Sequence, residues 1–413
     1  MPSGGDPRGH LAFWNLAKDP MKIRSIRATP VNIPLRAPYR FSYGSTGALT
    51  KTVIELLTED GVTGLGECAD GDRAADVEHM AERLIGRDIR DIGPARRACV
   101  PGMAYTPWDN VTAHRRVFGG IEMAMWDARG KTEGQPLHRL LGGAVRDEIA
   151  LTEYFSYRLP GVDEPGEASP ADIARFCARM IEDHDARIFE GKVGTVDFAE
   201  ELRMVAEVRA AIGERSLQLD ANGIWTLPTA RLALRKLMPF DISSFEEPCE
   251  SYEEMAALRQ HFDCPFSTHI VDLPKAVRLA CPDTIVTNIN ELGGIRGAMD
   301  FVASCAAMGV GFRFHSGETG VGSAAYLQLS AALEHVRGAS QTLLRWYGDD
   351  VIEGGPFVPK SGVVPVPQGP GLGVTLDPVA LRRCHARYLA EGRFPAGASA
   401  PPGSAYGSTF RKI

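Results

Sequence analysis

The chain has 413 residues, of which 44% are hydrophobic and 23% charged, and its formal net charge is −7 at neutral pH. This composition is normal for a soluble globular protein with a large core, and the length suits a barrel of about 250 residues plus a second domain. The negative balance argues against a nucleic-acid partner, which requires a basic surface. A protein of this charge that binds an acid has to concentrate positive charge locally, through a metal ion or through lysine and arginine.

Cysteine usage and the first residues bear on the compartment. The 8 cysteines are scattered singly without a CxxC pair, which indicates a reduced, cytoplasmic protein rather than a disulfide framework. No apolar run approaches the roughly 20 residues of a membrane span, so no membrane partner is expected. Residues 1–20 lack the apolar core of a signal peptide, and we expect them to be a disordered extension or to precede the true start, since Met21 opens a clean strand.

The N-terminal third has an α+β pattern. Alternating apolar and polar residues predict a strand over 21–35, and the segment 50–68 predicts a hairpin that turns at Glu59-Asp60-Gly61. Between them, 38–50 is rich in glycine, serine and aromatic residues and is expected to be a mobile loop. Apolar spacing predicts further helices, over 74–87, 117–142 and 379–391.

A repeating pattern begins near residue 149. Eight short β segments alternate with helices, and they cover residues 150–157, 186–194, 217–220, 242–248, 265–269, 284–288, 311–315 and 342–346. Such alternation predicts parallel strands with right-handed crossovers, as in a (β/α)8 barrel. A doubly wound open sheet is the alternative, but no GxGxxG turn opens any of the helices. The tail from 395 is expected to be flexible.

Polar side chains stand at the ends of seven successive β segments. They are Lys192, Asp220, Glu246, His269, Asn288, His315 and Asp349. A (β/α)8 barrel places its catalytic groups at the C-terminal ends of its strands, each from a different strand. The spacing therefore predicts one site at the mouth of the barrel, although Asp349 is equally compatible with a structural role at the rim.

Three of these residues are candidate metal ligands. Asp220 and Glu246 lie one βα unit apart, and two carboxylates on adjacent strands repel each other unless a cation lies between them. Oxygen-rich sites suit Mg²⁺. His269 is a third candidate, and its imidazole suits Zn, Mn or Fe better than Mg. The alternatives remain open at this point: helix caps or rim salt bridges for the carboxylates, Glu247 in place of Glu246, and a hydrogen-bonding role for His269.

Two further strand-end residues are candidate proton carriers. A desolvated lysine near a metal, such as Lys192, can act as a general base, and a histidine such as His315 titrates near neutrality. The alternatives are a solvated surface lysine and a structural histidine.

Several motifs together resemble the enolase superfamily, in its mandelate racemase and glucarate dehydratase branch. The resemblance covers roughly residues 21–383. It rests on GGIEMAMWDARGKTEGQPLHRLLGG at 119–143, GKVG, LDANGIW, FEEPC, NELGGI, the strand-end His315 and VPVPQGPGLGVTLD. The resemblance implies a modified (β/α)7β barrel at 148–365, an α+β capping domain from 21–147 with 366–394, and a homo-oligomer.

The resemblance also implies roles for the site residues. Asp220, Glu246 and His269 would hold Mg²⁺, with Mn²⁺ as an alternative, and Lys192 and His315 would be the catalytic pair. The 38–50 segment, which contains Tyr43, would close over the substrate. Further candidate substrate or catalytic contacts are Asn222, Glu190, Glu318 and Asn288.

Three positions depart from the pattern of this family. Glu190 stands where a second lysine is usual, Asn288 stands where the histidine's aspartate partner is usual, and His269 stands where glutamate, aspartate or asparagine is usual. Asn288 can orient the His315 ring but supplies no charge, and Glu190 would repel a substrate carboxylate.

The expected chemistry is abstraction of the proton alpha to a carboxylate, which gives a metal-stabilised enediolate. Dehydration of a small sugar acid is the favoured reaction, with Lys192 as the base and His315 as the acid. A racemase, epimerase or cycloisomerase is the second candidate, and a barrel that binds ligands without turnover is the third.

Overall fold

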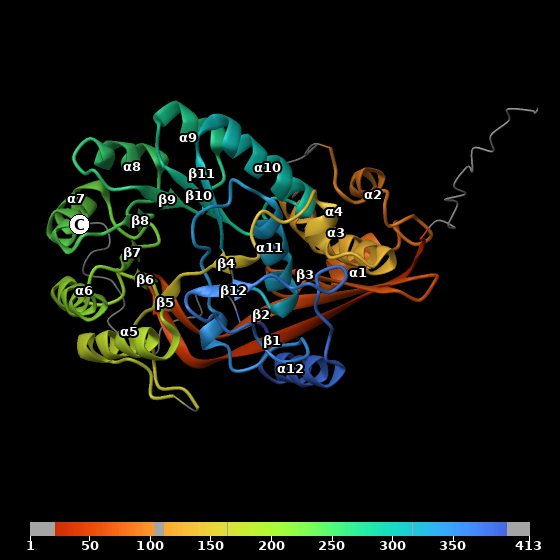
Figure 1. Ribbon diagram of the computed structural model, residues 1–413, viewed down its shortest axis with the longest axis horizontal. Coiled ribbons are helices and arrows are strands. Elements are labelled where there is room, and N and C mark those ends of the chain that lie inside the picture. Colours follow the sequence, from red (N-terminus) through yellow and green to blue (C-terminus); the bar gives the residue numbers. More distant parts are fainter. Residues whose placement is uncertain (1–20, 103–110, 163, 316, 395–413) are drawn as a thin grey trace, which may run out of the picture.

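A computed structural model of the chain describes residues 21–102, 111–162, 164–315 and 317–394. The chain forms a barrel and a capping lobe that lie side by side (Figure 1). The predicted N-terminal extension and flexible tail lie outside the described residues. In the part of the chain that is described, no helix is both long and apolar enough to span a membrane.

The capping lobe is built from both ends of the described chain. Its antiparallel sheet contains β1 (Ile23–Phe41), β2 (Gly44–Thr58) and β3 (Thr63–Cys68) in that order. Its helices are α1 (Ala74–Ala81), α2 (Ile92–Cys99), α3 (Val111–Glu133), α4 (Leu137–Leu140) and, against β1, α12 (Pro378–Glu391). Close packing of α3 on β3 requires glycine, because a Cβ at Gly64 would lie 2.0 Å from the carbonyl oxygen of Ala124.

The sequence-based expectations for this lobe are only partly met. The hairpin of β2 and β3 is confirmed, with Gly61 in the left-handed turn between them. The loop expected over 38–50 is wrong: these residues form the paired ends of β1 and β2, where Tyr39 pairs with Thr46 and Phe41 with Gly44. A register shift between Pro34 and Tyr39 breaks the alternation that identifies a strand, so the pairing is hidden in the sequence. The helix predicted over 117–142 is divided into α3 and α4, and α2 was not predicted.

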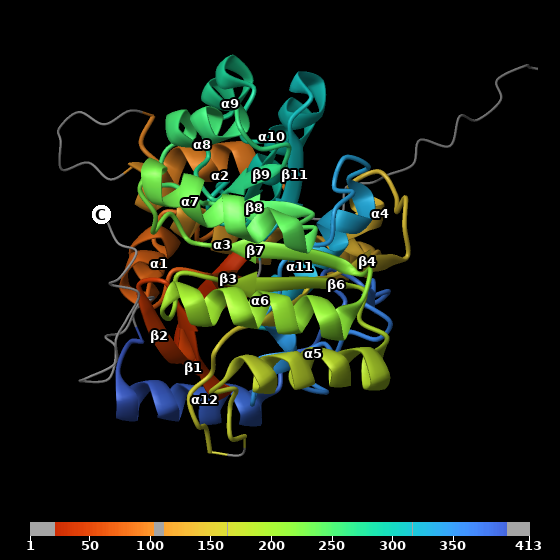
Figure 2. The ribbon, with the colours of Figure 1, turned by 90° about the vertical axis from the view of Figure 1, so that its left-hand side faces the viewer.

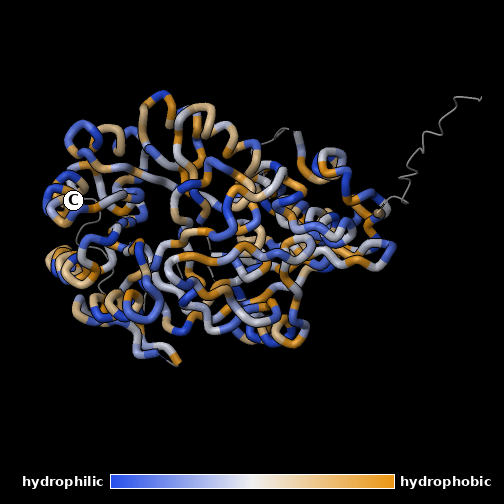
Figure 3. The backbone as a smooth tube through the Cα atoms, in the orientation of Figure 1, coloured by the Kyte–Doolittle hydropathy of each residue, from blue (hydrophilic) through white to orange (hydrophobic). Residues whose placement is uncertain are grey.

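The barrel has seven parallel strands in sequence order, and its helices lie around the outside (Figures 1 and 2). The strands are β5 (Glu153–Phe155), β6 (Ile188–Lys192), β7 (Ser216–Asp220), β8 (Ser244–Glu246), β9 (Phe266–Thr268), β10 (Thr284–Thr287) and β11 (Gly311–Phe314). The helices are α5 (Pro170–His184), α6 (Phe198–Ile212), α7 (Leu227–Leu237), α8 (Tyr252–Arg259), α9 (Leu273–Leu279), α10 (Ile295–Met308) and α11 (Gly320–Ala332), with the short 3-10 helix η1 (Met238–Phe240) after α7. Polar and apolar residues are mixed along most of the outer helices (Figure 3), as expected for helices with one face on the barrel, whereas α11 is buried over nearly its whole length.

The eighth β segment was predicted in the wrong place. Residues Leu344–Trp346 form a 3-10 helix, η2, rather than a strand. The closing backbone contacts come from the two residues before Thr342: Ser340 N donates to Ala150 O at 3.0 Å, and Gln341 N donates to Phe314 O at 3.0 Å. These bonds join β11 to the start of the barrel and give the (β/α)7β form. At the edge of the barrel β4 (Glu148–Ala150) pairs with β12 (Val363–Pro365).

Buried carboxylates of the capping lobe hold it to the barrel. Glu67 accepts hydrogen bonds from Thr319 N at 3.1 Å and Gly322 N at 3.0 Å, at the N-terminus of α11. Glu122 accepts from Arg296 N at 3.0 Å, at the N-terminus of α10. Helix N-termini carry partial positive charge and unpaired N–H groups, so both contacts are favourable. We call this contact region, around Glu67 and Glu122, the seam. It fixes the capping lobe over the barrel mouth.

Candidate active site

Six of the predicted side chains meet at the carboxyl ends of the barrel strands. Lys192, Asp220 and Glu246 are the last residues of β6, β7 and β8 and are paired in register across those strands. The other three follow the last residues of β9, β10 and β11, and they are His269, Asn288 and His315. The parallel register thus converts a regular spacing in sequence into one cluster.

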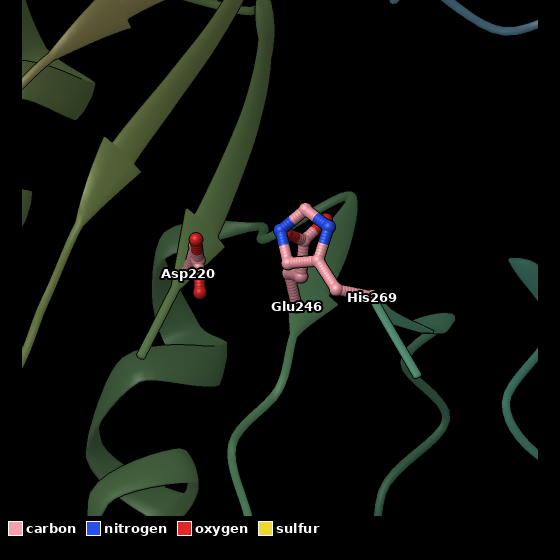
Figure 4. Close-up of side chains that lie close together, drawn as sticks. All are labelled: Asp220, Glu246 and His269. Carbon is pink, nitrogen blue, oxygen red and sulfur yellow. The ribbon is translucent and has the colours of Figure 1, made fainter. Parts of the chain in front are cut away.

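Asp220, Glu246 and His269 offer a set of metal-ligand atoms. One atom from each residue lies within 4.8 Å of the others, and both carboxylates are buried (Figure 4). Because the protein concentrates these groups away from water, a positive charge between them would lower their mutual repulsion.

Contacts of the His269 ring test whether the site fits a cation. Its Nδ1 lies 3.0 Å from Val286 O, a carbonyl that only accepts, so Nδ1 carries a hydrogen and the neutral ring presents the lone pair of Nε2. Nε2 lies 2.7 Å from Glu246 Oε1, and this buried oxygen has no other hydrogen-bond partner in the described structure. Two lone-pair atoms this close need a proton or a cation between them. A protonated ring satisfies this contact without a metal, but two carboxylates and one imidazole within 4.8 Å of one another are also ligands that a divalent cation accepts, so the residues present fit such an ion.

A charged layer of side chains lies directly beneath the ligands. Arg313 Nη2 is 3.1 Å from Glu246 Oε2, and the same guanidinium pairs with Glu190 and bonds Gln218. Gln341 donates to both Glu190 and Glu246. Glu190 therefore faces Arg313 inside the barrel, and its negative charge is offset there rather than presented at the mouth.

The Lys192 ammonium forms a buried ion pair with Asp220. Burial alone would lower the pKa of Lys192, but Asp220, together with Tyr154, Tyr39 and Glu246, outweighs burial and raises that pKa well above the usual value. Asn222 also bonds Asp220, through its backbone N at 2.7 Å and its side-chain Nδ2 at 2.9 Å. Asp220 is therefore held from two sides.

The two histidines of the mouth have opposite electrostatic environments. Burial lowers the pKa of His269, but Glu246 outweighs burial and raises it to about 9. Burial also lowers the pKa of His315, and the adjacent His269, whose ring centre lies 4.7 Å away, lowers it further. Asn288 lies beside His315 at the barrel mouth, but its Oδ1 accepts a hydrogen bond from Glu291 N at 2.9 Å. No hydrogen bond from Asn288 to the His315 side chain is present among the described residues.

The cap lies over the mouth, and an open cavity of about 500 Å³ lies between the cap and the strand ends. Tyr39, Phe41 and Tyr43 from the β1–β2 hairpin form one wall, and Lys51 from β2 also faces the cavity. Its lining also includes five more of the predicted residues, Lys192, Asn222, His269, Asn288 and His315.

Two predicted substrate contacts have other partners. Glu190 lies in the layer with Arg313, and the Glu318 carboxylate accepts from Gly317 N at 2.6 Å. Burial raises the pKa of Glu318 to about 7, and Lys51 partly offsets this. Neither side chain is part of the lining of this cavity as described. Asp349, the rim candidate, accepts hydrogen bonds from Arg383 and Arg387 of α12, and it is not part of the lining of this cavity as described.

Sequence reasoning missed Arg313, Gln341 and Lys51. A signal for Arg313 exists, because side chains two residues apart on a strand point to the same side, and Arg313 precedes His315 by two. Glu190 precedes Lys192 by the same interval. Gln341 and Lys51 carry no comparable signal, since both come from segments outside the predicted strand ends.

The chain matches two family descriptions. Residues 23–142 match the mandelate racemase / muconate lactonizing enzyme N-terminal domain, and residues 172–380 match the enolase C-terminal domain-like family. The chain therefore belongs to the enolase superfamily. This confirms the resemblance seen in the sequence and the capped (β/α)7β barrel that it implies.

Similar proteins include different activities. A probable glucarate dehydratase of Streptomyces coelicolor is 28% identical over an alignment of 379 residues, and the match covers 82% of this chain and 85% of that protein. A chloromuconate cycloisomerase of Cupriavidus pinatubonensis is 28% identical and covers 86% of this chain and 96% of its own length. An enolase structure from Pseudomonas fluorescens Pf0-1 with bound magnesium, potassium and tartrate has a TM-score of 0.83 at 27% identity, and covers 91% of this chain and 95% of its own. The chain is therefore an enzyme of a superfamily that includes both lyases and isomerases.

Proposed function

We propose that this enzyme removes the proton alpha to the carboxylate of a small sugar acid and then eliminates a β-hydroxyl group, as a dehydratase. Asp220, Glu246 and His269 would hold a divalent cation, Mg²⁺ in the family pattern. When bound, that cation stabilises the negative charge that develops on the substrate carboxylate as the proton leaves.

One observation carries this proposal: two proton carriers flank the ligand cluster. The candidate ligands come from β7, β8 and the end of β9, Lys192 lies on β6 to one side, and His315 follows β11 on the other. A carboxylate held at the cluster would thus have a nitrogen base on each side of its alpha carbon. We assign Lys192 Nζ as the base, a role that requires a cation at the ligand cluster to offset the charge of Asp220, which raises the pKa of Lys192. We assign His315 as the group that gives a proton to the departing hydroxyl, and it has to take up that proton first because its own pKa is lowered.

Charge in the cavity supports an acidic substrate. Lys51 is 9% exposed, and its Nζ donates to Ala69 O at 2.8 Å without a carboxylate within ion-pair distance among the described residues. Arg116 lines the same cavity, although it is paired with Glu291. An ammonium has three donors, so Lys51 has capacity left for a negatively charged ligand. This local positive charge opposes the net negative charge of the chain.

The proposal is tested by incubating the protein and Mg²⁺ with a panel of aldonic and aldaric acids and measuring 2-keto product. We expect turnover of at least one acid by the unaltered chain and none by Lys192→Ala. Circular dichroism checks that the variant is folded. Full activity of Lys192→Ala would overturn the assignment of the base, and failure to bind any divalent cation would overturn the proposed chemistry.

An isomerase is the second candidate, and the surroundings of His315 favour it. A dehydratase acid benefits from a partner that holds its proton, but Asn288 bonds the Glu291 backbone instead. An uncharged His315 opposite Lys192 suits a two-base racemase or epimerase, which removes a proton on one face and returns it on the other. Solvent deuterium in recovered substrate, without loss of water, would identify this reaction.

A further inference from the structure

The third candidate ligand, His269, is a nitrogen donor, and the type of donor atom influences which cation binds most tightly. We propose that the site prefers an imidazole-accepting first-row cation of the Fe²⁺, Co²⁺ or Zn²⁺ class over Mg²⁺, and that His269 sets this preference. The inference rests on the metal site of the proposed function but makes a separate claim, since proton abstraction requires only that some divalent cation binds.

His269 is held in the orientation of a ligand. Its Nδ1 donates to Val286 O at 3.0 Å, and its backbone N donates to Glu247 Oε1 at 2.8 Å. The ring therefore directs Nε2 toward Glu246 Oε1, 2.7 Å away. A metal-binding histidine commonly donates its other ring nitrogen to a carbonyl or carboxylate in this way, which fixes the tautomer and strengthens the donor.

The carboxylates can supply only a limited number of oxygens. Glu246 Oε2 already accepts from Arg313, Ser267 and Gln341, which leaves Oε1 as its free atom. Asp220 Oδ1 accepts from Asn222 N, and Oδ2 accepts from Lys192 and from the Asn222 side chain. The chain therefore presents few oxygens that are not already hydrogen-bonded, together with one nitrogen.

This donor set suits a softer ion better than magnesium, because one of its three ligands is a nitrogen. Mg²⁺ demands near-ideal octahedral geometry with oxygen ligands and loses its waters reluctantly. Zn²⁺ accepts histidine and carboxylate together, and its catalytic sites use three protein ligands and leave one position open. Imidazole is a softer donor than a carboxylate, so it favours Zn²⁺ and Fe²⁺ over Mg²⁺.

The structural alternative is an ion pair of protonated His269 with Glu246 that needs no metal. It predicts that removal of the His269 side chain has no effect on the relative affinity for different cations. A ligand role predicts a selective effect, because only the nitrogen-accepting ions lose a favoured donor.

The test is calorimetric titration of metal-free protein with ZnCl2 and, separately, with MgCl2, for the unaltered chain, His269→Asn and His315→Asn. Asparagine keeps an oxygen ligand at position 269. His315→Asn is the matched control, since it removes the adjacent imidazole without touching the ligand set. Co²⁺ visible absorption gives a second readout that is independent of catalysis and reports nitrogen coordination.

We expect the unaltered protein to bind one Zn²⁺ at least about 100-fold more tightly than Mg²⁺. His269→Asn should narrow this ratio by at least about tenfold, because loss of an outer partner of a ligand alone costs about 10- to 100-fold. His315→Asn should leave the ratio within about threefold, and the Co²⁺ spectrum should change only in His269→Asn.

Three outcomes would overturn the inference. An equal Zn²⁺ to Mg²⁺ ratio in the unaltered protein and His269→Asn would show that His269 does not set the preference. A collapse of the ratio in His315→Asn instead would assign the nitrogen to the other ring. Mg²⁺ binding as tight as that of Zn²⁺ would refute the preference but leave the proposed function intact, whereas failure of every cation to bind would refute both.

Discussion

Two regions of this molecule bury a glutamate to the same extent with opposite consequences. Glu122 at the seam and Glu246 at the mouth are each 1% exposed. Glu122 Oε1 accepts from neutral donors, Arg296 N at 3.0 Å and the Trp126 indole at 3.1 Å. Glu246 faces the Arg313 guanidinium and the His269 ring. Its Oε1 has no hydrogen-bond partner among the described residues and can share a proton with His269 or bind a cation.

The difference shows that the partners of a buried carboxylate decide whether it affects stability or activity. At the seam, fixed dipoles at a helix N-terminus face the Glu122 carboxylate, which joins the two lobes without an ionisable partner among its hydrogen bonds. At the mouth, ionisable groups solvate the charge, so adding a proton or a metal rearranges the whole cluster. We therefore expect substitutions at the seam to change stability, and substitutions at the mouth to change activity.

The largest effect is expected for Lys192→Met. Proton transfer by a positioned side chain contributes about 10²- to 10⁴-fold to rate, so kcat should fall by about that factor. The variant should still unfold in one cooperative transition, because the seam and the apolar core that runs from β1 and β2 into α10 and α11 are unaltered. Steady-state kinetics and thermal unfolding measure the two properties. Lys275→Met, at an exposed ion pair on α9, is the control.

Full activity in Lys192→Met would show that Lys192 is not the catalytic base. Loss of the folded state would instead show that the ion pair with Asp220 is needed for folding, and the distinction between the two regions would fail.

The converse prediction concerns the seam. Glu122→Ala leaves the Arg296 N–H and the Trp126 indole without their acceptor, and such a loss costs about 1–3 kcal/mol of unfolding free energy. Urea unfolding should show this decrease, while kcat at a temperature well below the transition stays unchanged. Glu133→Ala, an exposed residue on the same helix that pairs with Arg129, should change stability by less than about 0.5 kcal/mol.

The sequence predicts which side chains meet at the mouth but not which meet at the seam, and the geometry of each region explains why. The mouth is predictable because one strand-plus-helix unit separates successive strand ends, so Lys192, Asp220 and Glu246 had to come together once the barrel was inferred. Their proposed roles as base and metal ligands stay predictions. The seam is not predictable in this way, since Glu122 meets Arg296 across 174 positions with no period that links them.

The remaining errors have local causes. The η2 residues Leu344–Trp346 are apolar enough to resemble a strand, but the closing bonds belong to Ser340 and Gln341, whose polar side chains hide their role. The paired ends of β1 and β2 were assigned to a loop because composition dominates where a bulge interrupts alternation. In both cases backbone pairing, which composition does not encode, decides the structure.

A smaller effect on activity is expected at the edge of the mouth. Lys51→Met keeps most of the side-chain volume and removes the ammonium that faces the cavity. A hydrogen bond to a charged group contributes about 1.5–3 kcal/mol, so KM for an acidic substrate should rise by about tenfold or more, with a smaller change in kcat. Arg73→Met is the control, because Arg73 lines a second cavity of the cap, is not part of the described lining of the cavity at the mouth, and pairs with Asp76. An unchanged KM would place the substrate's negative charge elsewhere.

The smallest effect is a change in how stability depends on pH, and it separates charge from hydrogen bonding at the seam. Burial raises the pKa of Glu122 from 4.5 to about 7. Between these values the folded protein binds more protons than the unfolded chain, so this contribution to stability is present at low pH and is lost as pH rises through about 7.

Glu122→Gln keeps an oxygen that accepts from Arg296 N but cannot ionise. The decrease in unfolding free energy between pH 5 and pH 8 should therefore be smaller in this variant, by at most about 2.5 kcal/mol, with Glu133→Gln as the control. Urea unfolding at the two pH values measures it. An identical decrease in Glu122→Gln would mean that the seam carboxylate is already fully ionised at pH 5. Seam and mouth would then differ only in whether their charges have neutral or ionisable partners, and not in how readily each carboxylate takes up a proton.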